Sequence, residues 1–181
     1  AAVASTAFIS SAAFAADTDS QDFIVSGEVM DECSVENPDD VTFTEILINE
    51  GAGSTALLLK NGQPASDTQN IWVSCNYAAK LSASSTNDGL IGDNPSLVTT
   101  ANSGDFTNKI DYRIQLTATD GSFPTLDFRT GSNGGNSPTV NAPGAFHDEA
   151  ALFVYIDRDD TAKRPVAGTY TDTAILTVGP V

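Results

Sequence analysis

Few side chains in this sequence could carry out catalysis. His147 is the single histidine, and it stands in the segment Phe146-His147-Asp148-Glu149 just before an apolar run. No Gly-x-Ser-x-Gly motif stands on a strand, turn and helix, as a hydrolase of that type requires. No glycine-rich stretch has the lysine and the following helix of a phosphate-binding loop. We therefore predict no catalytic residue and no cofactor, and interpret His147 as an exposed loop residue. A secreted enzyme with a pocket around His147 is the alternative.

Clustered carboxylates are the other chemical signal, because calcium prefers oxygen ligands. Aspartates gather at residues 157–160 and again at 17–22. Neither group has the Asp-x-Asp-x-Asp-Gly spacing of a calcium-binding loop. We interpret both groups as solvated loop charge and predict no metal site, with bound calcium as the alternative.

The charge balance limits the partners of the protein. The 181 residues include 24 Asp and Glu against 8 Lys and Arg, a formal net charge of −16. Phosphate binding needs a basic surface, so this balance argues against nucleic acid and against anionic lipid as partners. Hydrophobic residues make up 40% of the chain, which is enough for the core of a single domain. The acidity itself favours solubility, or a saline environment that screens self-repulsion.

The first residues differ in composition from the rest. Residues 1–16 carry no charge, and Ala13-Phe14-Ala15 has the small-x-small pattern that ends a secretory signal. We therefore predict a signal-peptide remnant at 1–15, a polar extension at 16–22 and a single domain at 23–181. No stretch is long and apolar enough to span a membrane comfortably. The protein is thus expected to be exported, and the alternative is that Ala1 is the true mature end.

Export bears on the two cysteines, Cys33 and Cys75. In an oxidising compartment a lone pair of cysteines usually forms a disulfide. Two free thiols or a redox pair are the alternatives, which the wide spacing and the lack of a Cys-x-x-Cys motif disfavour.

The chain reads as strand after strand, because apolar and polar residues alternate with period two and no segment shows a 3.6-residue period. The predicted strands are residues 23–35, 41–47, 71–77 with a continuation over 80–85, 110–116, 123–128, 150–156 and 167–178. A loop or a short edge strand is predicted at 50–68, a loop at 130–144 and a turn at 87–89. The pattern predicts an all-β antiparallel sandwich.

Four segments together resemble a known family. They are V-S-G-E-V-M-D-E-C-S-V at residues 25–35, V-T-F at 41–43, I-W-V-S-C at 71–75 and A-G-T-Y-T-D-T at 167–173. Their order is similar to that of the spore coat protein U-like family, which includes the major pilins of archaic (Csu-type) chaperone–usher pili. The resemblance covers most of residues 23–178, and between 87 and 150 it rests on the strand pattern alone.

The resemblance implies an immunoglobulin-like sandwich that lacks its last strand. A periplasmic chaperone fills the resulting groove at first. The N-terminal segment of an identical subunit then replaces it at an outer-membrane usher, so that a head-to-tail fibre grows on the cell surface. In this chain the resemblance places the bridge at Cys33 and Cys75. It places candidate groove-lining residues at Ala174, Leu176 and Val178. Such a fibre serves adhesion or biofilm formation.

The donor segment departs from the expected pattern. Residues 16–22 are polar, so the candidate donor residues are Phe23, Val25 and Gly27, where glycine lets the backbones approach closely. The donor could instead be short, could begin within residues 1–15, or could complete its own domain without polymerising. A secreted monomeric sandwich that binds carbohydrate or calcium is the alternative function, with Trp72 as the candidate sugar-stacking residue.

Overall fold

The computed structural model describes residues 19–131 and 137–181. The chain divides into two units, residues 1–30 and residues 31–181. The described part of the first unit, residues 19–30, forms no helix or strand. The predicted signal remnant at 1–15 lies outside the described residues.

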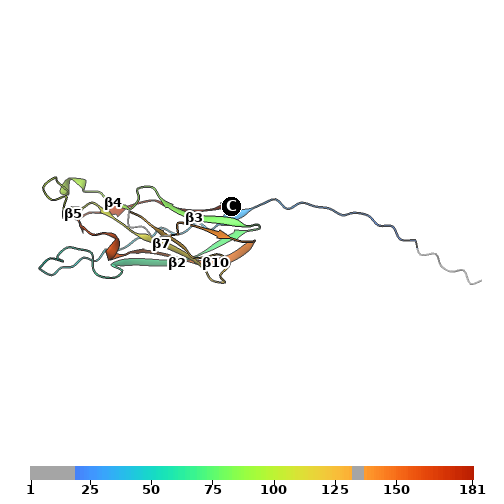
Figure 1. Ribbon diagram of the computed structural model, residues 1–181, viewed down its shortest axis with the longest axis horizontal. Helices are drawn as coiled ribbons and strands as arrows, with labels where there is room; N and C mark the ends of the chain where they lie inside the picture. The colour runs from blue at the N-terminus through green and yellow to red at the C-terminus, as the bar shows by residue number, and fades with distance from the viewer. Residues whose placement is uncertain (1–18, 132–136) are drawn as a thin grey trace, which may run out of the picture. The chain divides into compact units, whose positions relative to one another are not determined.

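The second unit is built almost entirely of β-strands (Figure 1). Its strands are β1 (Cys33–Val35), β2 (Ala65–Cys75), β3 (Ala79–Ser85), β4 (Leu90–Gly92), β5 (Phe106–Thr107), β6 (Lys109–Ile110), β7 (Arg113–Ala118), β8 (Leu126–Arg129), β9 (Thr139–Ala142), β10 (Phe146–Ile156), β11 (Arg164–Pro165), β12 (Tyr170–Thr171) and β13 (Ala174–Pro180). Two short 3-10 turns, at Pro95–Leu97 and Arg158–Asp160, are the helical elements among the described residues. None of its helices is long and apolar enough to cross a bilayer.

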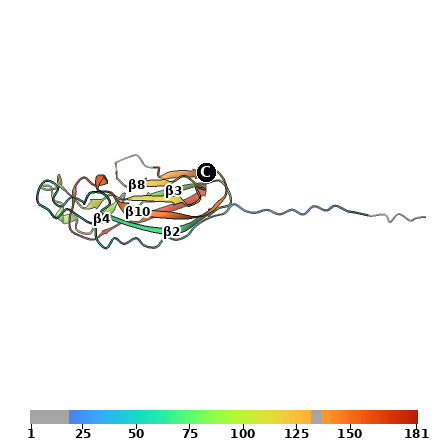
Figure 2. The same ribbon diagram turned by 90° about the horizontal axis from the view of Figure 1, so that it is seen from below.

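The largest sheet has five strands in the order β1-β2-β10-β7-β8, all antiparallel to their neighbours. Its longest pairing joins β2 to β10, from Phe146 opposite Cys75 to Ile156 opposite Ala65. A second antiparallel sheet has the order β13-β3-β9, and a third the order β12-β4-β6. The short pair β11-β5 is parallel. Figure 2 shows β3 next to β8, from a direction at right angles to that of Figure 1, and residues of these two strands lie within contact distance.

One buried cluster joins the two larger sheets. Ile71 and Leu152 come from the five-stranded sheet, and Leu81 and Val140 come from the sheet β13-β3-β9. All four are less than a tenth exposed. Side chains alternate across a strand, so each sheet contributes every second residue to this core. The predicted all-β class with antiparallel pairing is therefore confirmed, and the layering is sandwich-like.

One predicted strand is not formed, and another is formed in part. Residues 41–47 carry no strand although they alternate well, and of the predicted strand 23–35 the structure forms Cys33–Val35 as β1. A strand needs a hydrogen-bonded neighbour as well as an alternating pattern, and within the described part of the chain the backbone of residues 40–46 has none. Conversely, β9 forms within residues 130–144, where a loop is predicted. It is a strand because its backbone pairs with that of β3.

The predicted strand 110–116 is interrupted at Tyr112. Its backbone N–H donates to Thr130 Oγ1 at 2.9 Å, and its carbonyl accepts from the Thr130 N–H at 3.0 Å. These bonds replace the sheet pairing at this residue, so β6 ends at Ile110 and β7 begins at Arg113. The predicted turn at 87–89 is present, with Asp88 and Gly89 both at positive φ.

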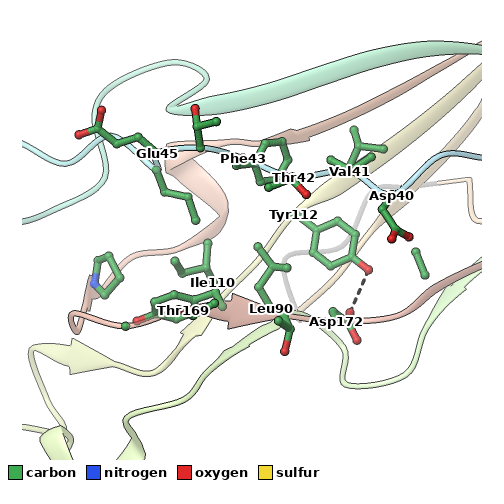
Figure 3. A pocket seen from close by; sticks show the side chains of 18 of the residues that line it. Asp40, Val41, Thr42, Phe43, Glu45, Leu90, Ile110, Tyr112, Thr169 and Asp172 are labelled. Carbon is green, nitrogen blue, oxygen red and sulfur yellow. Dashed lines mark hydrogen bonds between the residues drawn. The ribbon is translucent and has the colours of Figure 1, made fainter.

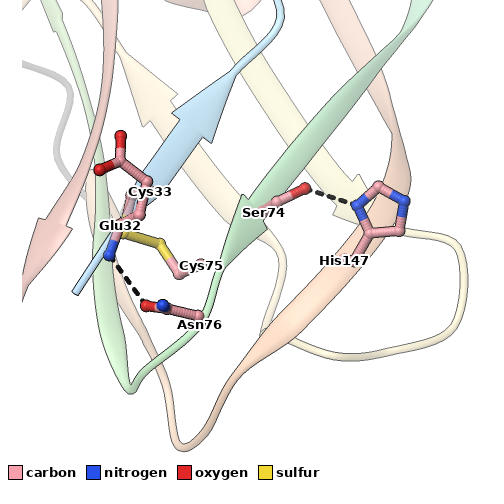
Figure 4. Close-up of a disulfide and its surroundings, with 6 residues drawn as sticks. All are labelled: Glu32, Cys33, Ser74, Cys75, Asn76 and His147. Atoms are coloured by element: carbon pink, nitrogen blue, oxygen red, sulfur yellow. Dashed lines mark hydrogen bonds between the residues drawn. A yellow bond between two sulfur atoms is a disulfide. The ribbon is translucent and has the colours of Figure 1, made fainter. Parts of the chain in front are cut away.

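The disulfide between Cys33 and Cys75 is present (Figure 4). It bridges β1 and β2, in which the two cysteines lie directly opposite each other. Asn76 adds further links beside it, because its side-chain oxygen accepts from the Glu32 N–H at 2.9 Å and its own N–H donates to the Glu32 carbonyl at 3.1 Å. The three-residue strand β1 is thus fixed covalently to the edge of the main sheet.

Replacing both cysteines with alanine is expected to lower the free energy of unfolding by about 2–4 kcal/mol, because the unfolded chain regains the freedom of the closed loop. Urea unfolding followed by circular dichroism measures this change. Reduced wild-type protein is the control and should match the variant. An unchanged unfolding midpoint in both samples would mean that strand pairing alone holds β1.

Candidate functional site

An apolar groove is the most prominent cavity of the second unit. Its volume is about 1370 Å³. One wall is the segment 37–46, and the opposite wall is the segment 165–174. The floor comes from several other strands and includes Leu90, Ile110 and Leu152. Figure 3 shows Val41 and Phe43 above the groove, with Ile110, Leu90 and Tyr112 across from them.

The first wall has an unusual backbone. Within the described part of the chain, the N–H and C=O groups of residues 40–46 have no hydrogen-bond partner. Partners begin on either side, where the Asp39 N–H donates to Gln69 Oε1 at 2.8 Å and the Leu47 N–H donates to the Pro64 carbonyl at 3.2 Å. Such a row of open backbone groups is a ready template for another strand.

The second wall is attached firmly on its other side. β12 pairs with β4, and β13 pairs with β3 along its whole length. Both β1 and β13 are edge strands of their sheets. Some of their residues lie within contact distance, yet the two strands are not paired with each other. The sandwich therefore has a seam between its first and last described strands.

The side chains along the groove are incompletely covered. Phe43, Ile46, Leu90, Val154 and Tyr170 pack against the core, yet each remains only partly buried. Beneath them, Ile110 and Ile114 are almost fully buried. A lining of this kind is suited to apolar side chains that enter from outside.

Asp172 connects the second wall to the floor. Its carboxylate accepts from Tyr112 Oη at 2.9 Å, from the Asn87 N–H at 3.0 Å and from the Ser85 hydroxyl. Burial by itself raises the pKa of Asp172, but these bonds and one from the Thr173 N–H outweigh burial and hold the pKa below its ordinary value. The group is therefore a charged acceptor that braces three segments.

The charge of the lining has a single sign. Asp39, Asp40, Glu45 and Asp172 line the groove, and no Lys, Arg or His occurs among its described lining residues. Figure 3 shows Asp40 and Asp172 among the labelled side chains.

The candidate groove residues on the last strand lie partly in this lining. Ala174 lines the groove and is exposed. Leu176 and Val178 lie further along β13, outside the lining, and pack half-buried against the core. The sequence predicts strands at 41–47 and 110–116, and the segment 167–173 carries part of the resemblance. The sequence does not predict that residues 40–46, Tyr112 and Asp172 line one groove.

The candidate donor residues lie in the other unit. Phe23 is 85% exposed and Val25 is 82% exposed, and a Cβ built on Gly27 would meet nothing within 4 Å. Ile24, Val29 and Met30 are also strongly exposed. A concentration of large apolar side chains in water within one short segment is unusual for a folded protein and marks an interaction segment.

His147 lies on the strand β10 instead of in the predicted loop. Its ring stacks on Trp72 with centroids 4.6 Å apart, and its Nδ1 lies 2.7 Å from Ser74 Oγ (Figure 4). Trp72 remains 45% exposed. Ser74 thus places a hydroxyl beside the imidazole at the sheet surface, and among the described residues no acid bonds to the ring.

The aspartates at 157–160 have structural partners. Asp160 is buried and accepts from Arg113 Nε at 2.6 Å and from Arg129 Nη1 at 2.9 Å. Asp157 is 3.5 Å from Arg113 Nη2. The described residues hold no group of three acidic, histidine or cysteine side chains placed to bind a metal. Of the other aspartate group, Asp19 and Asp22 belong to the first unit, and Asp17 lies outside the described residues.

No protein-family model matches the chain, and no curated protein matches it.

Replacing Asp172 with Asn is expected to lower the free energy of unfolding at pH 7 by about 1–3 kcal/mol, because a charged acceptor of several hydrogen bonds is lost. The lowered pKa of Asp172 also has a consequence for pH. Its stabilisation is present above the unfolded pKa of about 3.9 and is lost as the pH falls through the lower folded value.

Urea unfolding between pH 7 and pH 2 measures both effects. The variant should lose less stability than wild type below about pH 4. Asp159→Asn is the matched control, because that side chain is 88% exposed, and it should follow wild type. Equal stability of Asp172→Asn and wild type at pH 7 would show that the hydrogen bonds of Asp172 do not brace the wall.

Proposed function

We propose that this protein is a structural subunit of an extracellular pilus or fimbria, assembled by donor-strand complementation and serving adhesion or biofilm formation. In this proposal the second unit is an incomplete immunoglobulin-like sandwich. Its missing strand comes from the N-terminal segment of another copy. The domain would resemble the spore coat protein U-like family and the archaic chaperone–usher pilins in this respect.

One observation carries the proposal. The groove is apolar, and one of its walls is a stretch of seven residues, 40–46, whose backbone groups have no partner within the described chain. Residues 40–46 are exposed or half-buried, so this row of open backbone groups is accessible to another strand. An added strand satisfies the backbone of this wall and covers the partly buried side chains of the lining in the same step.

The exposed segment of the first unit has the matching chemistry. Phe23, Val25 and Val29 alternate, so a strand formed by this segment presents them on one face, with Gly27 between them. Burying each large side chain contributes about 1.5–3 kcal/mol. Exposure of these residues to water is therefore unfavourable, and their burial in a groove would contribute binding free energy.

The partners follow from this arrangement. A head-to-tail contact between identical subunits uses two different surfaces, the donor segment of one copy and the groove of the next. Each added subunit therefore leaves a free groove or donor, and the contacts build an open fibre. Before assembly the open groove requires a substitute strand, which we assign to a periplasmic chaperone that delivers the subunit to an outer-membrane usher. The protein then passes through the periplasm to the cell surface.

A second candidate function is a secreted module that binds neutral carbohydrate. It is favoured by Trp72, which is 45% exposed and held on the ring of His147 at the surface of the main sheet. An exposed aromatic face supported in this way can stack on a sugar ring. Such a module would function as a monomer, without a strand added to the groove.

Val25→Asp is expected to abolish polymer formation, because a charge would enter an apolar groove without a partner. The matched control is Ile24→Asp, the neighbouring residue, which is also strongly exposed but falls on the opposite face of a strand. The measurement is a gel of the full chain assembled at about 1 M NaCl, where charges that stay in water at the rim are screened. Fibres sheared from cells are a second sample, and both samples are run with and without heating. Wild type and Ile24→Asp should give a ladder that collapses on heating, and Val25→Asp should give monomer.

A single monomer band for wild type in both lanes, with no fibres released, would contradict the pilin proposal. Equal loss of the ladder in both variants would show that no particular face of the segment is inserted.

The binding-module candidate has its own test. If it holds, monomeric protein should bind neutral oligosaccharides, and Trp72→Ala should weaken binding by about 10-fold or more through loss of the stacking surface. Quenching of the emission of Trp72, the single tryptophan, measures the wild type, and calorimetry compares the two proteins. Absence of binding to a broad panel of neutral glycans would remove this candidate.

A further inference from the structure

We propose that insertion of the donor segment is opposed by like charges on both partners, so that ionic strength controls assembly through the groove. This inference rests on the proposed function and adds a condition under which the groove is filled.

The groove contributes negative charge alone. Its described lining holds Asp39, Asp40, Glu45 and Asp172, without any basic residue. Three cations of the domain have acidic partners away from the lining. Arg113 and Arg129 bind Asp160, and Lys109 binds Asp88 and Asp111.

The donor contributes the same sign. Its described residues include Asp19, Asp22 and Glu28, and the first basic residue of the whole chain is Lys60. Donor and first wall are thus both drawn from a stretch that contains acids and no bases. Opposite charges that face each other across a strand pair stabilise it, and that arrangement is not available to these two segments.

Strand geometry brings these charges close together. Adjacent strands lie about 4.8 Å apart, and like charges directly opposite each other destabilise the pair. When the face of Phe23, Val25 and Val29 enters the groove, Asp22 and Glu28 project from the opposite face of the same strand. They remain at the rim, in water, beside the acidic wall.

The position of these charges makes their repulsion dependent on salt. The screening length is about 30 Å at 0.01 M salt and about 3 Å at 1 M salt. The separation between neighbouring strands falls between these two lengths, so the repulsion acts fully in dilute buffer and is largely screened at high salt. Apolar burial in the groove is not screened, so it dominates when salt is added.

The test is refolding of the full chain, with its disulfide intact, from urea into buffer at about 0.01 M or about 1 M NaCl. Polymer is followed on unheated gels over time. Wild type should assemble at least about 10-fold faster at the higher salt concentration, in line with the usual size of electrostatic effects on association.

Two charge reversals separate this effect from a general influence of salt on apolar contacts. Glu28→Lys places a cation on the donor, so its assembly at low salt should approach the high-salt rate of wild type, with a flat or reversed salt dependence. Glu149→Lys makes the same change of net charge on the exposed part of β10, outside the groove lining. It should keep the salt dependence of wild type.

The outcomes are distinct. Assembly of wild type at equal rates in both buffers, or equal behaviour of the two lysine variants, would overturn the electrostatic inference and leave the proposed function standing. Failure of wild type to assemble in either buffer, together with the absence of a heat-sensitive ladder in material sheared from cells, would overturn both.

Discussion

A strand must find a hydrogen-bonded neighbour, and this constraint governs the whole domain. β2 and β10 satisfy it over eleven residues each and form the centre of the main sheet. The other strands are added outward from this pair or pack across from it. Where the chain has no neighbour to offer, at residues 40–46, an alternating sequence remains without strand structure. These residues form one wall of the groove, so the groove is where the described backbone lacks a neighbouring strand.

The elements beside the groove are held in place so that it can remain open. The disulfide fixes β1 to the main sheet, and Asp172 ties the last strands to Tyr112 on the floor. The buried Arg113–Asp160–Arg129 network fastens the turn after β10. These links give both walls support from behind, so neither wall has to pair with the other. A preformed site of this kind loses less entropy when an added strand binds.

The acidity of the protein has two effects in this interpretation. A large net charge of one sign keeps subunits with exposed apolar residues apart in solution. The same charge lies along the groove and the donor segment, so it also opposes the contact that the apolar residues favour. In this interpretation the acidic side chains keep the subunits soluble before assembly but weaken the contact between assembled subunits. The salt concentration sets how strong this repulsion is.

The sequence by itself determined the β class, the disulfide partners and the position of most strands, because local alternation and the count of cysteines are properties of the chain alone. It also showed that residues 23–29 combine alternating apolar side chains with no counterbalancing base. Only the tertiary structure decided that residues 41–47 form no strand and that β9 does. It also decided that Asp172 bonds to Tyr112 across 60 residues. The reason is that strand formation, burial and hydrogen-bond satisfaction depend on neighbours distant in sequence, which a local pattern does not contain.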